Sequence, residues 1–144
     1  MKNVLLIEAG AEVTIYPPIG LIHLASVIRD KYKVIIKDFS GKKINEKEVE
    51  ELIIKTNPFI IGIRVLTGPG IPRALLISKI AKKLGKIVIW WGPHPTILPE
   101  QTLENKYIDS VCIGEGEYAL QDLLKYYEGK IKKVLGTGIK EDGK

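Results

Sequence analysis

The sequence predicts an α/β fold, a doubly wound five-stranded parallel sheet of the Rossmann or flavodoxin type, with a short C-terminal strand or half-hairpin. Short apolar runs alternate five times with segments whose apolar residues recur at helical spacing. Parallel neighbours require crossovers, so this alternation favours helices on both faces of one sheet. Five such strands most often adopt the order 2-1-3-4-5, with the switch point between strands 1 and 3.

The expected strands are the apolar runs at residues 3–8, 33–37, 59–66, 87–91 and 110–113. The expected helices cover residues 19–30, 46–56, 73–84, 99–105 and 117–127. Pro18 suits the start of the first helix, because the N–H that proline lacks would be unpaired there. Asn45 can cap the second helix with Glu48 as its capping-box partner, and Gly85 can end the third helix.

The end of the chain has the pattern of a half-hairpin. Residues 134–139 read as a short strand, and residues 141–143 as a turn whose returning strand would begin at Lys144. We therefore expect a domain over residues 1–130 and an extension over residues 131–144 that leads into a longer protein.

The composition predicts a soluble globular domain. The chain has 144 residues, of which 45% are hydrophobic and 27% charged. No apolar stretch approaches the roughly 20 residues of a membrane span, and Met1 leads directly into a strand, without room for a signal peptide. We therefore expect a cytoplasmic protein. Abundant Ile, Lys and Glu with few Gln residues suggest a thermophilic source.

Charge and cysteine content point to no additional site. The net charge is +5, but the lysines follow helix faces without interleaved aromatic residues, so nucleic-acid binding is not expected. The single cysteine, Cys112, lies inside an apolar strand and reads as a small buried hydrophobe. One cysteine excludes an internal disulfide, a four-cysteine zinc site and a cysteine-ligated iron–sulfur cluster within this chain.

Four loops meet at the carboxyl edge of the predicted sheet, the edge at which such folds bind ligands. They cover residues 9–18, 67–72, 92–98 and 114–117. Their glycines would let a ligand approach the backbone, although tight turns alone would also need them. His94 lies between two prolines in a rigid loop, and a functional role is favoured, with hydrogen bonding, metal ligation and packing all open. His23 is expected to be structural or exposed.

Several enzyme classes lack their motifs. The chain has no Gly-x-x-x-x-Gly-Lys-Ser/Thr loop and no three-glycine dinucleotide fingerprint after the first strand. The third strand ends in Ile63-Arg64-Val65, where a phospho-acceptor domain would need an aspartate. No serine or cysteine nucleophile follows a strand with a histidine beside it. These absences predict a ligand-binding module without catalytic residues of its own.

Four motifs in order resemble the N-terminal cobalamin-binding domain of B12-dependent radical SAM enzymes, a class that includes many methyltransferases. They are Tyr16-Pro17-Pro18-Ile19-Gly20-Leu21, Trp91-Gly92-Pro93-His94-Pro95-Thr96, Leu98-Pro99-Glu100 and Gly114-Glu115-Gly116-Glu117. The resemblance implies a corrinoid held base-off, with its nucleotide tail threaded into the carboxyl edge. It also implies that SAM and a 4Fe–4S cluster bind only in a radical SAM domain downstream in the parent chain.

The resemblance assigns cofactor-binding positions and no metal ligand. These positions are Pro17, Pro18, Gly20, Arg64, Leu66, Thr67, Gly68, Trp91, Gly92, His94, Thr96, Gly114, Glu115, Gly116 and Glu117. The chain departs from the family pattern at three points. The Asp-x-His-x-x-Gly motif is absent after the first strand, Trp91 replaces the first of two glycines, and Arg64 replaces a small hydroxyl residue.

The leading hypothesis is a cobalamin-binding domain from the front of a radical SAM enzyme, with methyltransferase activity in the parent. The alternative is a non-catalytic scaffold or interaction domain of the same fold with a closed ligand edge. A small nucleotide-binding regulator is a third class, without a motif to support it.

Overall fold

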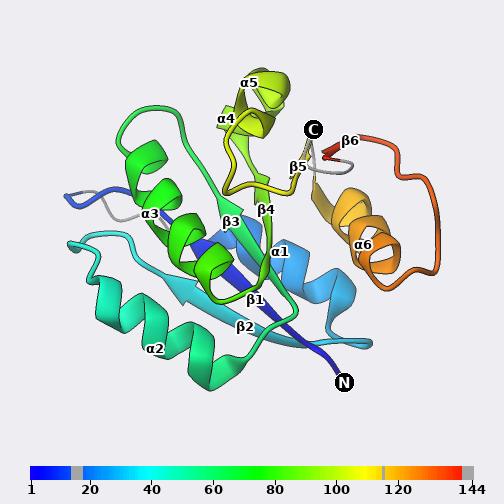
Figure 1. The fold of residues 1–144 in the computed structure, drawn as a ribbon, viewed down its shortest axis with the longest axis horizontal. Coiled ribbons are helices and arrows are strands. Elements are labelled where there is room, and N and C mark those ends of the chain that lie inside the picture. Colours follow the sequence, from blue (N-terminus) through cyan, green and yellow to red (C-terminus); the bar gives the residue numbers. More distant parts are fainter. Residues whose placement is uncertain (14–17, 115, 141–144) are drawn as a thin grey trace.

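The structure, a computed structural model, describes residues 1–13, 18–114 and 116–140. Helices cover both faces of one six-stranded sheet (Figure 1). The strands are β1 (Asn3–Glu8), β2 (Lys33–Asp38), β3 (Ile60–Arg64), β4 (Ile87–Trp91), β5 (Ser110–Cys112) and β6 (Thr137–Ile139). The helices are α1 (Ile19–Ile28), α2 (Glu46–Thr56), α3 (Gly70–Lys83), α4 (Pro93–Ile97), α5 (Pro99–Leu103) and α6 (Gly116–Tyr127).

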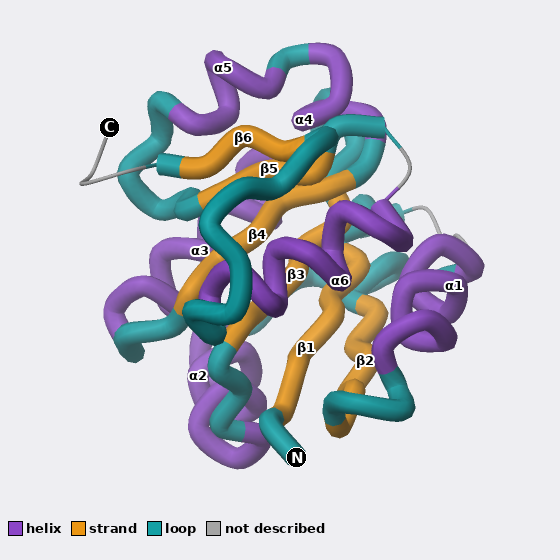
Figure 2. The backbone as a smooth tube through the Cα atoms, turned by 90° about the vertical axis from the view of Figure 1, so that its right-hand side faces the viewer, coloured by secondary structure: helices purple, strands orange, loops and turns teal. Residues whose placement is uncertain are grey.

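The strand order is β2-β1-β3-β4-β5-β6, which confirms the predicted order of the first five strands. These five pair in parallel, and β6 pairs antiparallel with β5 at the edge. Figure 2 shows α2 and α3 on one side of the sheet and α1 and α6 on the other. The short C-terminal strand expected over residues 134–139 is β6, and the expected turn at residues 141–143 lies outside the described residues.

Each face of the sheet has its own apolar core, because successive side chains of a strand point to opposite faces. Leu5 and Ile7 pack with α2 and α3. Val4 and Leu6 pack with α1 and α6. Burial on both faces explains why β1 reads as a continuous apolar run without alternation.

The helix ends follow the sequence signals in part. Asn45 Oδ1 accepts hydrogen bonds from the N–H groups of Lys47 and Glu48, so the predicted cap is confirmed. The Glu48 carboxylate, expected to complete a capping box, accepts from Lys42 Nζ instead, at 3.0 Å. Gly85 follows α3 with φ 75°, the left-handed conformation expected of a helix end.

The expected loop over residues 92–98 is wrong, because residues 93–97 form α4. Gly92 turns the chain with φ 104°, and Pro93 then occupies the first helical position, where no N–H is needed. Strand β3 is also shorter than expected. It ends at Arg64, opposite Trp91, the last residue of β4.

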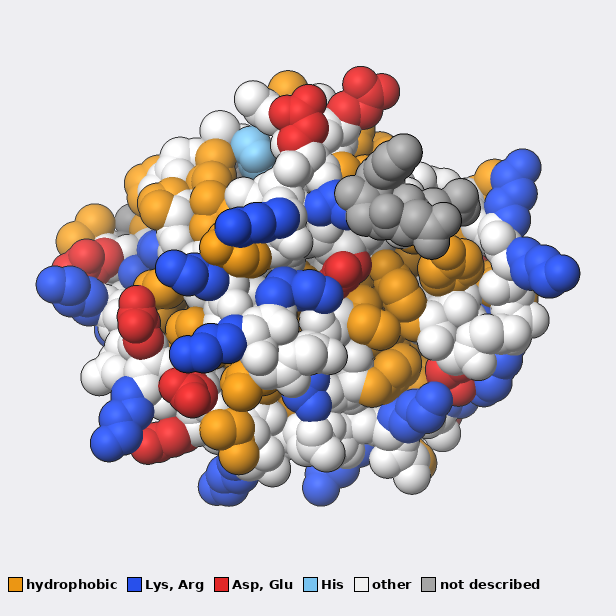
Figure 3. Space-filling view, in the orientation of Figure 1, with side chains coloured by type: hydrophobic (Ala, Val, Ile, Leu, Met, Phe, Trp, Pro, Cys, Tyr) orange, Lys and Arg blue, Asp and Glu red, His pale blue; other side chains and the backbone are white. Residues whose placement is uncertain are grey.

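The outer surface carries mixed charge. On the face in Figure 3, Lys and Arg side chains are spread widely and Asp and Glu lie among them. Of the helices in the described part of the chain, none is long and apolar enough to cross a membrane.

Candidate functional site

Three side chains form one row at the carboxyl edge of the sheet, which we call the edge row: Glu8, Arg64 and Trp91. Glu8 on β1 is the register partner of Arg64 on β3, and Arg64 is the partner of Trp91 on β4. Strand alternation places all three side chains on the face that α1 and α6 cover.

An ion pair holds the edge row together. Arg64 Nη1 donates to both carboxylate oxygens of Glu8, at 3.2 and 3.3 Å, and Glu8 is only 1% exposed. Burial raises the pKa of Glu8 above its ordinary value, although the Arg64 guanidinium acts in the opposite direction. The guanidinium carbon lies 5.9 Å from the centre of the Trp91 ring, within the range of a cation–π contact.

The Trp91 indole lies where three elements carry glycine, at Gly20 in α1, Gly62 in β3 and Gly116 in α6. We call this space the glycine slot. A Cβ added at Gly20 would lie 3.0 Å from Trp91 Cη2, one at Gly116 3.8 Å from Cε3, and one at Gly62 4.0 Å from Nε1. Trp91 is 7% exposed, and among the described residues its buried Nε1 has no hydrogen-bond partner.

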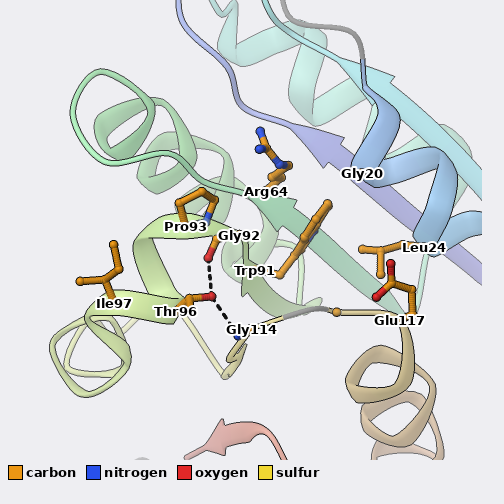
Figure 4. A pocket seen from close by; sticks show the side chains of 11 residues that line it. Gly20, Leu24, Arg64, Trp91, Gly92, Pro93, Thr96, Ile97, Gly114 and Glu117 are labelled. Atoms are coloured by element: carbon orange, nitrogen blue, oxygen red, sulfur yellow. Dashed lines mark hydrogen bonds between the residues drawn. The ribbon is translucent and has the colours of Figure 1, made fainter.

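An open cavity of about 500 Å³ lies over Arg64 and Trp91 of the edge row (Figure 4). Strands, helices and loops that are distant in sequence contribute to it. Its lining consists of Gly20, Leu24, Arg64, Trp91, Gly92, Pro93, Thr96, Ile97, Gly114, Gly116 and Glu117. Four glycines in this lining expose backbone to a bound molecule. We call this space the edge cavity.

Thr96 fixes one wall of the edge cavity. Its hydroxyl donates to the Gly92 carbonyl at 2.8 Å and accepts from the Gly114 N–H at 3.0 Å, as the dashed lines of Figure 4 show. One side chain therefore joins the start of α4 to the loop that follows β5.

Most of the residues predicted from the sequence meet at this cavity, but not all of them. Those that line it are Gly20, Arg64, Trp91, Gly92, Thr96, Gly114, Gly116 and Glu117. Pro18 precedes α1 and is not part of the lining, nor are Leu66, Thr67 and Gly68 of the loop after β3. Pro17 and Glu115 lie outside the described residues.

His94 lies on the other side of the sheet from the edge cavity. It is 7% exposed, its Nδ1 lies 3.3 Å from Thr67 Oγ1, and its ring meets the Trp90 ring edge-on. Both His94 and Trp90 line a separate cavity of about 220 Å³ against α3 and α5. Burial lowers the pKa of His94 below its ordinary value. His23 is exposed on α1, and exposure was one of the two alternatives expected for it.

Sequence reasoning missed four residues of the site. Leu24, Pro93 and Ile97 line the edge cavity, and Glu8 anchors the edge row. Glu8 carried a usable signal, because it is a carboxylate at the end of a strand that is otherwise apolar. Ile97 is 71% exposed, and nothing in its sequence context distinguishes it from an apolar residue that lies on the surface without a function.

The described residues hold no group of three or more His, Cys, Asp or Glu side chains placed to bind a metal ion. Cys112 is 1% exposed, and burial raises the pKa of its thiol to about 12. A thiol that stays protonated is a poor nucleophile and a poor metal ligand. The site offers a shaped, partly apolar surface and one anchored cation.

Comparison with known proteins identifies a matching family model. Residues 6–124 match the model described as the B12 binding domain. Among curated proteins, the chain is 35% identical over 133 residues to the uncharacterized methyltransferase PH0819 of Pyrococcus horikoshii. That match covers 89% of this chain and 29% of the relative, so the chain spans less than a third of that protein.

Two solved structures share the fold. The radical S-adenosylmethionine methyltransferase TsrM of Kitasatospora setae, solved with tryptophan substrate and aza-SAM, matches with a TM-score of 0.86 at 18% identity. The cobalamin-dependent S-adenosylmethionine radical enzyme OxsB, solved with aqua-cobalamin, matches with a TM-score of 0.81 at 23% identity. The matches cover 99% and 100% of this chain, but 29% and 22% of those two chains.

Proposed function

The chain belongs to the B12 binding domain family, and on this premise we propose that it holds cobalamin at the edge cavity. We further propose that it does so as the cofactor-binding domain of a B12-dependent radical SAM enzyme. Its 35% identity to a relative named as a methyltransferase supports methyl transfer as the parent's reaction. The low coverage of the relatives supports a further domain in that parent.

The edge cavity carries this proposal. Its volume of about 500 Å³ lies within the roughly 300–1,000 Å³ range of small-molecule sites. Large exposed apolar side chains lie in its lining or next in sequence to a lining residue, and we call them the apolar rim. They are Ile19 at 59%, Ile97 at 71%, Ile113 at 38% and Tyr118 at 83%. An exposed apolar rim around a hollow is typical of a surface that a ligand or a partner covers. A corrin ring with the downstream domain above it would cover this rim.

The residues of the site fit the proposed group at this rim. Gly92, Gly114 and Gly116 would let the ring lie close to the backbone, and Thr96 would fix the wall beside it. The motifs that the chain shares with B12-dependent radical SAM enzymes support a corrinoid held base-off, and we propose that state here. When bound, cobalamin would carry a methyl group between SAM and the substrate.

This chain would bind and orient the cofactor and would not act on substrate alone. We propose that SAM and the 4Fe–4S cluster bind to the downstream radical SAM domain, because Cys112 is the single cysteine of this chain. A Cys-x-x-x-Cys-x-x-Cys motif after Lys144 in the source gene would support that parent.

A second candidate function is the scaffold domain, and the Trp91 indole in the glycine slot is the observation that favours it. Titration with hydroxocobalamin separates the two. Cobalamin binding predicts a saturable base-off shift in the visible spectrum. Absence of any shift at high micromolar cobalamin, in both the wild-type chain and Trp91→Gly, would favour the scaffold.

A further inference from the structure

The glycine slot has room for one flat aromatic group, and Trp91 occupies it. The three glycines come from α1, β3 and α6, and a Cβ on any of them would lie within 4.0 Å of the indole. Because Trp91 also lines the edge cavity, the indole forms the boundary between that cavity and the apolar core beneath α1 and α6. Figure 4 shows the ring standing between Arg64 and Leu24.

Packing holds the indole in the glycine slot. Its Nε1–H is buried without an acceptor among the described residues, whereas tryptophan N–H groups in protein interiors usually have one. Arg64 lies against the ring and is itself fixed by both oxygens of Glu8. Arg64 and Glu8 therefore act as positioning residues for Trp91.

A second flat ring cannot enter the glycine slot while the indole is there. Gly20 lies close enough to the indole that even one added carbon would meet it at 3.0 Å. Interiors packed to this density do not accept extra volume without displacement of a side chain. A planar base would have to expel Trp91 or remain in the edge cavity.

We propose that Trp91 makes this domain recognise the corrin ring of its cofactor and not the base of the nucleotide tail. This inference rests on the proposed function. A base that stays outside the glycine slot buries no surface there, so nothing offsets the free energy that base-off binding costs when the base leaves the cobalt. The domain therefore binds cobinamides, which are corrinoids without the nucleotide base, at least as tightly as cobalamin.

Isothermal titration of the chain with aquacobalamin and with diaquacobinamide tests the inference. For the wild-type chain we expect diaquacobinamide to bind at least as tightly as aquacobalamin. Trp91→Gly opens the glycine slot, and burial of the base there should shift the ratio of the two dissociation constants toward cobalamin by at least about tenfold relative to the wild type. Trp90→Phe is the matched control, since Trp90 lies on the opposite face of β4, and it should keep the wild-type ratio.

The outcomes separate this inference from the proposed function. A wild-type preference for cobalamin above about threefold would overturn the inference and leave the proposed function standing. An unchanged ratio in a folded Trp91→Gly variant would overturn it as well, whereas binding of neither corrinoid to the wild-type chain would overturn both. The comparison of the two corrinoids on the wild-type chain needs no variant. It therefore tests the inference even if circular dichroism shows Trp91→Gly to be unfolded.

Discussion

Replacement of Gly92 by alanine tests whether the turn after β4 sets the shape of the edge cavity. Gly92 has φ 104° and ψ −166°, a region that is nearly restricted to glycine. An added Cβ would lie 3.1 Å from Arg64 Cγ, and 3.3 and 3.4 Å from the carbonyl oxygen and nitrogen of Val65. Val65 cannot retreat, because its N–H donates to the Trp91 carbonyl at 2.9 Å and its carbonyl accepts from the His94 N–H at 3.1 Å.

The expected loss of stability is the sum of two effects. The backbone conformation costs about 1–3 kcal/mol for a residue other than glycine, and a methyl group forced against fixed atoms costs about 1–3 kcal/mol more. We expect Gly92→Ala to lower the free energy of unfolding by about 2–6 kcal/mol. With a slope of about 2 kcal/mol per M urea, the midpoint of urea unfolding falls by about 1–3 M. Circular dichroism during a urea titration measures this shift.

Gly85→Ala is the matched control for this prediction. Gly85 also has a positive φ, 75°, but no atom lies within 4 Å of an added Cβ. Its replacement should therefore cost only the left-handed conformation, about 1–2 kcal/mol. Equal losses in the two variants would refute the argument that close contacts fix the Gly92 turn. Wild-type cobalamin affinity in Gly92→Ala would refute its role in the edge cavity.

Three further predictions concern the wall of the edge cavity and the buried titratable groups. Thr96→Val removes the hydroxyl that joins α4 to the loop after β5, so stability should fall by about 1–2 kcal/mol and the cobalamin dissociation constant should rise several-fold. Thr102→Val is the control: it removes a hydroxyl that donates to the Leu98 carbonyl, and it should leave the cobalamin dissociation constant unchanged. Because the pKa of His94 is lowered on folding, the unfolded chain binds the proton first. The free energy of unfolding should therefore fall as the pH drops below about 6.5. Denaturation at several pH values should show a flatter slope in His94→Gln than in the wild type. Cys112, with its pKa raised to about 12, should react with a disulfide reagent at pH 8 only as fast as the chain unfolds, and rapid labelling would contradict its burial.

The sequence predicts the sheet well because its signals are local. Each buried strand is an apolar run with turn residues after it, and five runs with helices between them leave few possible topologies. The segment after β4 is predicted wrongly because its helix depends on distant partners. The N–H of His94 bonds to the carbonyl of Val65, which lies 29 positions earlier in the chain, and Thr96 bonds to the loop after β5. From composition alone, a Gly-Pro-His-Pro sequence is predicted to form a loop.

Dependence on distant partners also explains which candidate site residues meet at the edge cavity and which do not. Glycines at strand ends can be placed at the carboxyl edge from topology alone, and Gly92 and Gly114 line the edge cavity as expected. The face that a loop side chain takes depends on how the loop folds back on its neighbours. His94 and Thr96 are two positions apart in α4, yet His94 packs against Trp90 on the α3 side and Thr96 lines the edge cavity. No periodicity in a five-residue helix predicts that separation.

The two adjacent tryptophans of β4 allow a direct test of what each indole contributes. Trp90 Nε1 donates to Ser78 Oγ at 2.9 Å in the core beneath α3, whereas Trp91 Nε1 has no partner among the described residues. An unpaired buried donor costs about 1–3 kcal/mol, and a hydrogen bond contributes about 1 kcal/mol. Phenylalanine fills much of the same space without a donor.

Trp90→Phe should therefore lower the free energy of unfolding by about 1–3 kcal/mol, since it loses a hydrogen bond and leaves a small cavity. Trp91→Phe also leaves a small cavity but removes the unpaired donor, so its stability should stay within about 1 kcal/mol of the wild type. Urea unfolding of the two variants measures the difference. Equal losses would mean that Trp91 Nε1–H has an acceptor in solution. The indole would then be held in the glycine slot by a specific bond, and the argument that packing alone keeps it there would fail.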